Sequence, residues 1–571
     1  MVGHEFYKYN YESMEYGSAH ALINGFKGFC NFLGLQSYST FGTSWGGGLN
    51  EMALESYLGR ANYIYDDKYY VSASIRRDGS SKFKTNDTRW GTFWSVGAGW
   101  RISSEKFMEG TKSWLDNLKF RASYGVLGNQ NGIPMYAGYQ TWSYGVASWA
   151  GSGTSTYPSA VKLSKGGWVN SALTWEKVHT TDAGLDFTLF GGKVSGTFDW
   201  YNKHTVNAFF NKNMSYLASG QASALLNCAG IRNNGIELEL SWQPVKTNDW
   251  DVLFSTNGTH YNTRITSVPD GTGSEALNGC WLASDDGWSI SGQGASSGKE
   301  FLRGVGKDYY NLYLYKYGGV AGNPGKTYYD ASGKAYTGYT KGDPDAGKPL
   351  FYHRVTAEEA EKGMFGGAKA GTDILTTNTN TDFCTRYEVG DALPEWIGGF
   401  TTNVRYKNFD LGIVFTYQIG GKFFSVDYAS GESGKYMAGN NIAQPAAVSR
   451  ELLNNTWSEE NQSAKFPMVY YNSAVTQSGC TLGSWNYTDL ALFDASYLSI
   501  KNITLGYTLP SNLTKKIHIS NLRVYASCDN PVLLYSHSGI DPRWSITGGM
   551  AVGAYSYPYL SVYTFGVNLD F

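Results

Sequence analysis

The stretch from Tyr563 to Phe571 reads YTFGVNLDF, and its residues alternate between two kinds. Tyr563, Phe565, Val567, Leu569 and Phe571 are nonpolar or aromatic, whereas the residues between them are Thr, Gly, Asn and Asp. Successive side chains of a β-strand point to opposite faces of the sheet. This segment therefore predicts a strand with one face suited to lipid and the other suited to water.

The same alternation recurs upstream in the chain. From Asp410 to Ile419 every second residue is large and nonpolar, and Val414 is the one exception on the polar side. Around Ile236 the nonpolar residues alternate with Glu237 and Glu239. A shift by one residue would move these carboxylates into hydrocarbon, at a cost of a few kcal/mol each. The face that each residue takes is therefore strongly specified.

The same criterion applied to the whole chain predicts about fourteen strands. The first is weak and precedes Tyr16. The others are expected at residues 56–65, 69–77, 91–102, 118–127, 174–190, 193–209, 236–243, 251–264, 397–406, 410–419, 496–509, 522–535 and 563–571.

The predicted connections alternate between short and long. Short ones are expected at residues 66–68, 191–192, 244–248, 407–408 and 510–519, with a longer one at 103–116. The others include long loops near 17–55, 128–173, 265–395 and 420–494, and further ones at 78–90, 211–230 and 536–557. Short turns at one end and long loops at the other are typical of outer-membrane barrels, in which the short turns are periplasmic. The long loops are therefore expected outside the cell.

Composition agrees with one repeated architecture over residues 1–571. The chain has 18 Trp, 44 Tyr, 28 Phe and 70 Gly, and only 16% of its residues are charged. No run of about 18 apolar residues occurs, which excludes a helical membrane protein. The net charge of −2 gives no reason to expect a nucleic-acid partner.

The start of the chain does not have the pattern of an export signal. Residues 1–20 read MVGHEFYKYNYESMEYGSAH, without a basic region followed by an apolar one. An outer-membrane protein needs such a signal to reach its compartment. Either the natural N-terminus lies upstream of Met1, or the membrane interpretation is wrong.

Several segments together resemble the SusC/RagA-type TonB-dependent outer-membrane transporters. They include SYLGRANYIYDDKYYVSASIRRDGSSKF from Ser56, LTWEKVHTTDAGLDFTLFGGKVSGTFDWYNKHT from Leu173, NNGIELEL from Asn233, LPEWIGGFTTNVRYKNFDL from Leu393, DASYLSIKNITLGYTLP from Asp494 and SGIDP from Ser538. One departure is Pro531 directly after Asn530, where such proteins usually continue an aromatic-rich strand.

The resemblance implies an all-β fold, an antiparallel transmembrane β-barrel of about 22 strands that encloses an N-terminal plug domain. With about fourteen strands visible, this chain is expected to be the C-terminal portion of such a barrel, without the plug and without the segment that contacts TonB. The implied function is import of a glycan or peptide across the cell outer membrane. The alternative is a smaller passive porin-like channel that is complete at about fourteen strands.

The resemblance also implies partners. These are outer-membrane lipid around the wall, a SusD-like surface lipoprotein acting as a lid, and the TonB complex, reached through the missing N-terminal part. The barrel assembly machinery is expected to recognise the terminal strand through Tyr563, Phe565, Val567, Leu569 and Phe571.

Six tryptophans in the expected external loops are candidates for substrate binding, because an aromatic face can stack on a sugar ring or a peptide side chain. They are Trp142, Trp149, Trp168, Trp281, Trp288 and Trp485. Packing between loops and a place in the aromatic girdle at the membrane interface are the alternatives.

No catalytic, metal or cofactor site is predicted. The two GxSxG matches, at Gly42 and Gly294, lack the strand and helix that frame a nucleophile, and no two histidines are spaced four residues apart. Asp343 and Asp345 in GDPDAGK could belong to a calcium site, but a solvated turn is the favoured interpretation. The sequence therefore favours a transporter over an enzyme.

Overall fold

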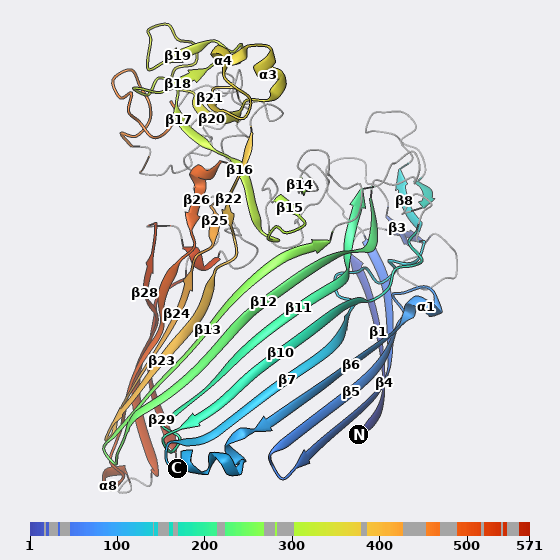
Figure 1. Ribbon diagram of the computed structural model, residues 1–571, viewed down its shortest axis with the longest axis vertical. Coiled ribbons are helices and arrows are strands. Elements are labelled where there is room, and N and C mark those ends of the chain that lie inside the picture. Colours follow the sequence, from blue (N-terminus) through green and yellow to red (C-terminus); the bar gives the residue numbers. More distant parts are fainter. Residues whose placement is uncertain are drawn as a thin grey trace. The chain divides into compact units, whose positions relative to one another are not determined.

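The computed structural model describes most of the chain, and its long strands form one large sheet, with smaller sheets in the connections (Figure 1). The described residues are 1–15, 19–21, 32–34, 46–140, 142–146, 159–163, 169–213, 223–267, 280–282, 302–378, 385–425, 451, 453–468, 488–514, 519–537, 539, 541–544 and 559–570.

Within these residues, fourteen strands are hydrogen-bonded neighbours in the order in which they follow one another along the chain. They are β1 (Val2–Glu15), β4 (Gly46–Tyr65), β5 (Tyr69–Ser80), β6 (Trp90–Arg101), β7 (Leu115–Asn129), β10 (Glu176–Leu189), β11 (Val194–Asn213), β12 (Ser223–Lys246), β13 (Trp250–Ser267), β23 (Trp396–Tyr406), β24 (Phe409–Ile419), β27 (Tyr497–Thr508), β28 (Asn521–Tyr535) and β29 (Val562–Asp570). Within this sheet, every pair whose register is described is antiparallel, as in β4 with β5 and β23 with β24. The predicted number of strands and the all-β fold class are confirmed.

Several strands are longer than predicted, and β4 and β12 differ most. β4 begins at Gly46 rather than Ser56, and β12 begins at Ser223, inside the loop expected at 211–230. The added residues of β4 pair with β1 down to Glu15 opposite Gly46. Backbone hydrogen bonds hold such extensions without any alternation of nonpolar side chains. The alternation therefore marks only part of each strand.

Because neighbouring strands run antiparallel, successive connections lie at alternating ends of the sheet. One end has tight turns, such as the one after β4, where Asp66 and Asp67 adopt left-handed φ angles of 50° and 51°. The same end carries the 3₁₀ helices η2 (Ile102–Ser104) and η3 (Lys106–Thr111) and the short helix α8 (Ser511–Thr514). This is the end with the short connections, which the sequence predicts to be periplasmic because outer-membrane barrels have short periplasmic turns and long external loops.

The opposite end carries the long connections, which contain short elements of their own. Among the described residues these are β2 (Ala19–Ala21), β3 (Phe32–Gly34), α1 (Asn86–Arg89), β8 (Trp142–Val146), β9 (Ser159–Leu163), β14 (Cys280–Leu282), β15 (Leu302–Gly304), β25 (Lys422–Phe424), β26 (Leu492–Asp494), η5 (Asp489–Ala491) and η7 (Pro542–Trp544).

The segment expected as a long loop at 265–395 contains a folded module. Its elements are β16 (Asn311–Tyr315), β17 (Tyr317–Val320), β18 (Thr327–Tyr329), β19 (Ala335–Thr337), β20 (Pro349–Arg354), α3 (Ala357–Glu361), α4 (Met364–Gly367), β21 (Asp373–Thr376) and β22 (Arg386–Asp391). Its centre is well packed, and Tyr328, Leu350 and Phe351 are fully buried. We call this part the external module. Its strands are too short for a periodic pattern to reveal them in the sequence.

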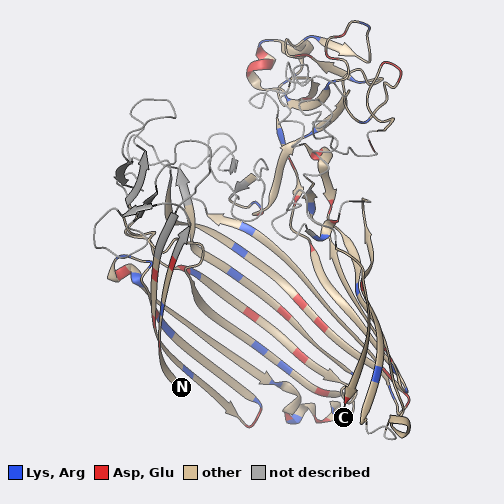
Figure 2. Cartoon of the chain, turned by 180° about the vertical axis from the view of Figure 1, so that it is seen from behind, with Lys and Arg blue, Asp and Glu red and all other residues tan. Residues whose placement is uncertain are grey.

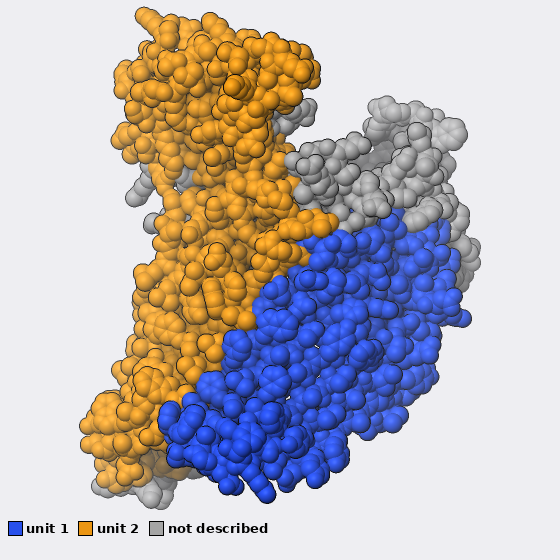
Figure 3. Space-filling view, viewed as in Figure 1, with its two compact units in different colours: residues 1–192, 197–235, 265–272 blue, residues 193–196, 236–264, 273–571 orange. Residues whose placement is uncertain are grey.

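The chain divides into two compact units (Figure 3). Unit 1 comprises residues 1–192, 197–235 and 265–272, and unit 2 comprises residues 193–196, 236–264 and 273–571. No helix in the part of the chain that the structure describes is long and apolar enough to cross a membrane.

The two faces of the sheet differ in unit 1 as the alternation predicts. On β5 the exposed side chains include Val71 (49%) and Ile75 (57%), whereas Ser72 and Ser74 between them are half-buried. Ala73 lies opposite Val96 on β6, which is also exposed. A water-soluble sheet would cover a nonpolar surface of this size. We call this surface the nonpolar face and the opposite one the polar face.

Unit 2 repeats the pattern. On β12, Leu238 and Trp242 are exposed large hydrophobic residues, and Glu239 lies one position away on the other face. On β23 and β24, Phe400 stacks on Phe415 with ring centres 4.2 Å apart. These observations agree with the predicted phase near residue 236 and place Phe400 and Phe415 on one face; that this face of β24 meets lipid stays a prediction.

Candidate functional site

Charged residues of both signs lie at intervals along the strands of both units (Figure 2). In unit 1 they gather around Arg121 of β7. Its Nε donates to Asp186 at 3.0 Å, and its Nη2 donates to Asp199 at 2.6 Å. Asp182 lies 3.6 Å from the same guanidinium. Three carboxylates therefore surround one arginine, which leaves this cluster with excess negative charge.

A glycine makes this cluster possible. Arg121 pairs in register with Gly184 of β10, and it reaches past Gly184 to Asp199 on β11. A Cβ atom at position 184 would lie 2.6 Å from Cζ of Arg121 and would collide with a carboxylate oxygen of Asp199. The Arg121 side chain can therefore reach from β7 across β10 to β11 only because β10 has no side chain at position 184.

Unit 2 contains a second arginine that crosses a glycine. Arg523 of β28 binds both carboxylate oxygens of Asp410 on β24, at 3.0 Å from Nε and 2.5 Å from Nη2. Gly506 of β27 lies opposite Asp410, and a Cβ there would be 2.6 Å from Asp410 Oδ2. Paired nitrogen donors fix the carboxylate in one orientation. The same device therefore occurs once in each unit.

A hollow of about 530 Å³ lies beside this second ion pair on β12, β13, β23, β24, β27 and β28. Gln243 donates to Asp251 at 2.7 Å, and Arg405 lies 3.8 Å from the same carboxylate. At the other side Asn502 donates to Asp529 at 2.7 Å. The lining thus presents hydrogen-bond donors and acceptors in fixed positions.

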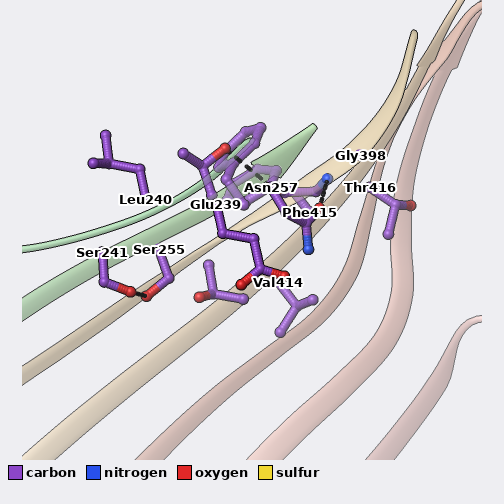
Figure 4. A pocket seen from close by; sticks show the side chains of 13 residues that line it. Glu239, Leu240, Ser241, Ser255, Asn257, Gly398, Val414, Phe415 and Thr416 are labelled. Atoms are coloured by element: carbon purple, nitrogen blue, oxygen red, sulfur yellow. Dashed lines mark hydrogen bonds between the residues drawn. The ribbon is translucent and has the colours of Figure 1, made fainter. Parts of the chain in front are cut away.

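A second hollow of about 380 Å³ lies on β12, β13, β23 and β24 (Figure 4). Ser241 and Ser255 are hydrogen-bonded at 3.0 Å, and the Asn257 side chain accepts from the backbone N–H of Gly399 at 2.8 Å. Glu239 also lines this hollow. No ion pair within the described ranges holds its carboxylate.

In the external module the two aspartates considered for calcium are occupied by protein donors. The Tyr328 hydroxyl donates to Asp343, and the Asp343 carboxylate also accepts from the backbone of Asp345 at 2.9 Å. Lys348 lies 2.5 Å from the Asp345 carboxylate, which Thr377 also contacts. Asp345 is buried, so the solvated turn favoured by the sequence is wrong. Among the residues with described side chains, no group of three or more His, Cys, Asp or Glu could hold a metal ion.

Two carboxyl groups share a hydrogen bond at one end of the external module, that of Asp308 just before β16 and that of Asp391 at the end of β22. Burial raises the pKa of both Asp308 and Asp391, and their proximity raises that of Asp391 further. Asp391 also accepts from the backbone N–H of Leu393 at 2.9 Å. A proton shared between the two carboxyl groups therefore stabilises this point at mildly acidic pH.

We expect Asp391→Asn to stabilise this region at pH 7.5. An acid with a raised pKa in the folded state adds stability that is complete below its ordinary pKa of about 3.9 and is lost as the pH rises through the folded value. The oxygen of the new side-chain amide still accepts from the backbone N–H of Leu393, and its NH₂ group can donate to the Asp308 carboxylate at any pH. The gain should be of the order of 1 kcal/mol. This gain in stability should appear as slower hydrogen exchange of the backbone amides of β16 and β22.

The comparison is made between variant and wild type at pH 7.5 and again at pH 4, where the difference should vanish. Glu361→Gln, which alters an exposed acid on α3, serves as the control. An equal effect of Asp391→Asn at both pH values would contradict the shared proton.

The structure says little about the six candidate tryptophans. Trp142 lies in β8 and Trp281 in β14, but their side chains lie outside the described part of the chain. The remaining four also fall outside the described residues; they are Trp149, Trp168, Trp288 and Trp485. Their role in binding stays a prediction.

The terminal strand is β29, which pairs with β28. Tyr563, Phe565, Val567 and Leu569 are all exposed, with Phe565 at 83%. Phe571 lies outside the described residues. Recognition of this strand by the assembly machinery stays a prediction.

Sequence reasoning did not identify the two arginine clusters. Asp182, Asp186 and Asp199 each occupy a polar position of an alternating strand, and so does Arg121. A signal was present, because a glycine within a strand indicates a close approach of neighbouring groups. What the sequence lacked was the register that places Gly184 opposite Arg121.

Comparison with known proteins places the chain in a family. The family described as "TonB dependent receptor-like, beta-barrel" matches residues 2–358. The TonB-dependent receptor P3 of Formosa agariphila is 27% identical over 533 residues, which cover 92% of this chain and 46% of that protein. The TonB-dependent receptor SusC of Bacteroides thetaiotaomicron is 26% identical, over 91% of this chain and 44% of SusC.

Among solved structures, the RagAB peptide transporter superposes with a TM-score of 0.72 over 100% of this chain and 53% of that one. The sequence identity of 23% means that this match shows a shared fold. The chain thus spans about half the length of the relatives that it matches. Since the family match covers more than half of the chain, the protein belongs to the TonB-dependent receptors of the outer membrane and comprises β-barrel sequence of that family.

Proposed function

We propose that this chain is the C-terminal barrel portion of a SusC/RagA-type importer of glycan or peptide fragments. The observation that carries the proposal is the separation of the two faces. Exposed nonpolar rows such as that of Val71 and Val96 suit lipid, whereas the opposite face holds ordered ion pairs and polar hollows. A wall of this kind lets a polar solute cross the membrane without meeting hydrocarbon. The proposed role is therefore transport rather than catalysis.

The proposal also includes the domains and partner proteins that would act with this chain. The relatives are about twice as long, which supports an N-terminal part that supplies the remaining strands, the plug and the TonB contact. Movement of the plug would open the path when TonB pulls on it. A SusD-like surface lipoprotein would close over the external loops. The similarity to SusC and to the RagAB peptide transporter supports both partners.

The substrate class follows from the chemistry of the polar face. Its hollows offer amides, hydroxyls and charges of both signs, such as Gln243, Asn502 and Arg405, which suit the many donors and acceptors of a sugar or a peptide backbone. We propose that the external tryptophans make the first contact by stacking. They are Trp142, Trp149, Trp168, Trp281, Trp288 and Trp485.

The proposal is tested by uptake of fluorescent oligosaccharides and oligopeptides into cells that carry either this chain alone or the gene extended upstream of Met1. We expect uptake only with the extended gene, and we expect an uncoupler of the proton gradient to abolish it. Uptake through the chain alone that resists the uncoupler would favour the passive channel. Uptake of neither class by the extended gene would contradict the importer.

The same assay tests the tryptophans. Replacing each by Ala should raise the substrate concentration at half-maximal uptake by about 2- to 12-fold, since an aromatic contact contributes about 0.5–1.5 kcal/mol beyond its buried area. Trp242→Phe on the nonpolar face serves as the control. Unchanged half-saturation in all six variants would contradict the proposed contacts.

A further inference from the structure

The connection between β6 and β7 exposes two large aromatic side chains at the periplasmic end of unit 1. It contains η3 and continues to Trp114. Phe107 is 68% exposed and Trp114 is 45% exposed. Aromatic side chains of this size suit a boundary between a nonpolar and a polar environment.

The turn is fixed to the ends of the neighbouring strands. The Glu105 carboxylate accepts from the Tyr69 hydroxyl at 2.6 Å and from Trp100 Nε1 at 3.1 Å. At the other end of the turn, the carbonyl of Trp114 accepts from the backbone N–H of Phe190 at 2.8 Å. Because both ends are held, the exposed aromatic residues keep their places relative to the sheet.

Phe107 continues the nonpolar face beyond the end of β6. Its ring meets the ring of Trp100 edge-on, with centres 6.4 Å apart. Trp100 itself belongs to the exposed row that includes Trp94 and Val96. The surface of the turn is therefore continuous with the surface that faces lipid. Aromatic residues at this level characterise the boundary between acyl chains and headgroups.

The charges of the turn suit the same boundary. Lys106 is the first residue of η3 and Lys112 follows its last residue; both are exposed, and Glu109 is the exposed acid between them. Glu105 is occupied by Tyr69 and Trp100, and Lys68 lies 3.9 Å from it. Asp116 accepts from the backbone N–H groups of Gly191 and Gly192. The exposed ammonium groups of Lys106 and Lys112 therefore suit the negative phosphates of phospholipids.

We propose that residues 106–114 form an interfacial anchor in the periplasmic leaflet of the outer membrane. Phe107 and Trp114 lie among the headgroups and the upper parts of the acyl chains, and Lys106 and Lys112 contact phospholipid phosphates. The turn so fixes the height of β6 and β7 relative to the bilayer. The anchor depends on the outer-membrane location of the family and on the periplasmic position of the short turns. It does not depend on which substrate the importer carries.

A photoreactive benzophenone side chain placed at single positions tests the anchor in cells that carry the extended gene. We expect phospholipid adducts from positions 107 and 114. Position 75 on the nonpolar face is the positive control, and position 248 in the polar turn between β12 and β13 is the negative control. Adducts at 75 without adducts at 107 and 114 would overturn the anchor and leave the importer intact. Crosslinks from 107 to a protein, or to lipid A of the outer leaflet, would also overturn it.

A second experiment tests the lysines. The complete receptor is reconstituted in vesicles of phosphatidylethanolamine with or without phosphatidylglycerol. The adduct yield at position 107 should rise with the anionic lipid in the native sequence. That rise should be lost in the double variant that carries both Lys106→Gln and Lys112→Gln. The control Lys246→Gln at the end of β12 should keep it. A rise that persists in the double variant would contradict the phosphate contact.

Discussion

Replacing Ala73 by Arg will strongly reduce the amount of folded protein in the outer membrane, whereas Arg at the adjacent Ser72 will leave it nearly unchanged. Ala73 lies on the nonpolar face between Ala61 and Val96. An arginine there costs about 2–4 kcal/mol at the middle of the bilayer and less near its surface. Because Ala73 is small and exposed, its replacement removes no packing. The loss would therefore report the charge in lipid alone.

Ser72 makes a matched control because it lies on the same strand and points to the other face. It pairs with Gly97, which pairs in turn with Ser123 of β7. These small side chains leave room for an arginine, and Asp182 opposite Ser123 offers a counter-charge.

The amount of folded protein is measured by its heat-dependent mobility in gels of outer-membrane fractions. Ala73→Leu should behave like the native chain, which separates the effect of charge from the effect of size. Equal losses from Arg at positions 72 and 73 would show that the assigned faces are wrong.

The second large effect is expected from Gly184→Ala. A methyl group at this position meets the guanidinium of Arg121 and the carboxylate of Asp199, so the pair that spans two strands must separate. Breaking it leaves partly buried charges without their partners. Since about a third of the Arg121 side chain is exposed, solvent recovers part of the loss, and we expect a destabilisation of about 1–3 kcal/mol.

Gly59→Ala on β4 is the matched control for this change. A Cβ there would meet only the Ile75 side chain at 3.6 Å, which is an ordinary contact, so the stability should change by less than about 0.5 kcal/mol. The readout is the midpoint of unfolding by urea in lipid vesicles. Asp199→Asn should cost less in the Gly184→Ala background than in the native one, because the ion pair is already broken there. Additive effects would refute the role of Gly184.

The fold was predictable where its signal is local. Each strand that crosses the membrane has lipid on one face and water on the other, so its residues alternate with a period of two, as in Tyr563 to Asp570. The pattern needs no knowledge of partner strands. It gave the number of strands, their phase and the alternation of short and long connections.

The signal was missing where a strand continues beyond its alternating residues. The first part of β4, from Gly46, and the first part of β12, from Ser223, extend beyond the alternating residues and are held by backbone pairing. The external module was missed for a related reason. Its strands are short, and the buried Trp457, which belongs to the connection between β24 and β27, packs near Gly322 and Gly347 of the module, far away in the chain. No local period can reveal such contacts.

The sequence by itself determined which residues face lipid, because transfer from water to hydrocarbon depends on each side chain alone. Only the tertiary structure decided which charges meet on the polar face. Arg121 and Asp199 are 78 residues apart in the chain, and Arg523 and Asp410 are 113 apart. Each pair forms because the register of three strands places a glycine between its members, and register is set by pairing between segments rather than by any one segment.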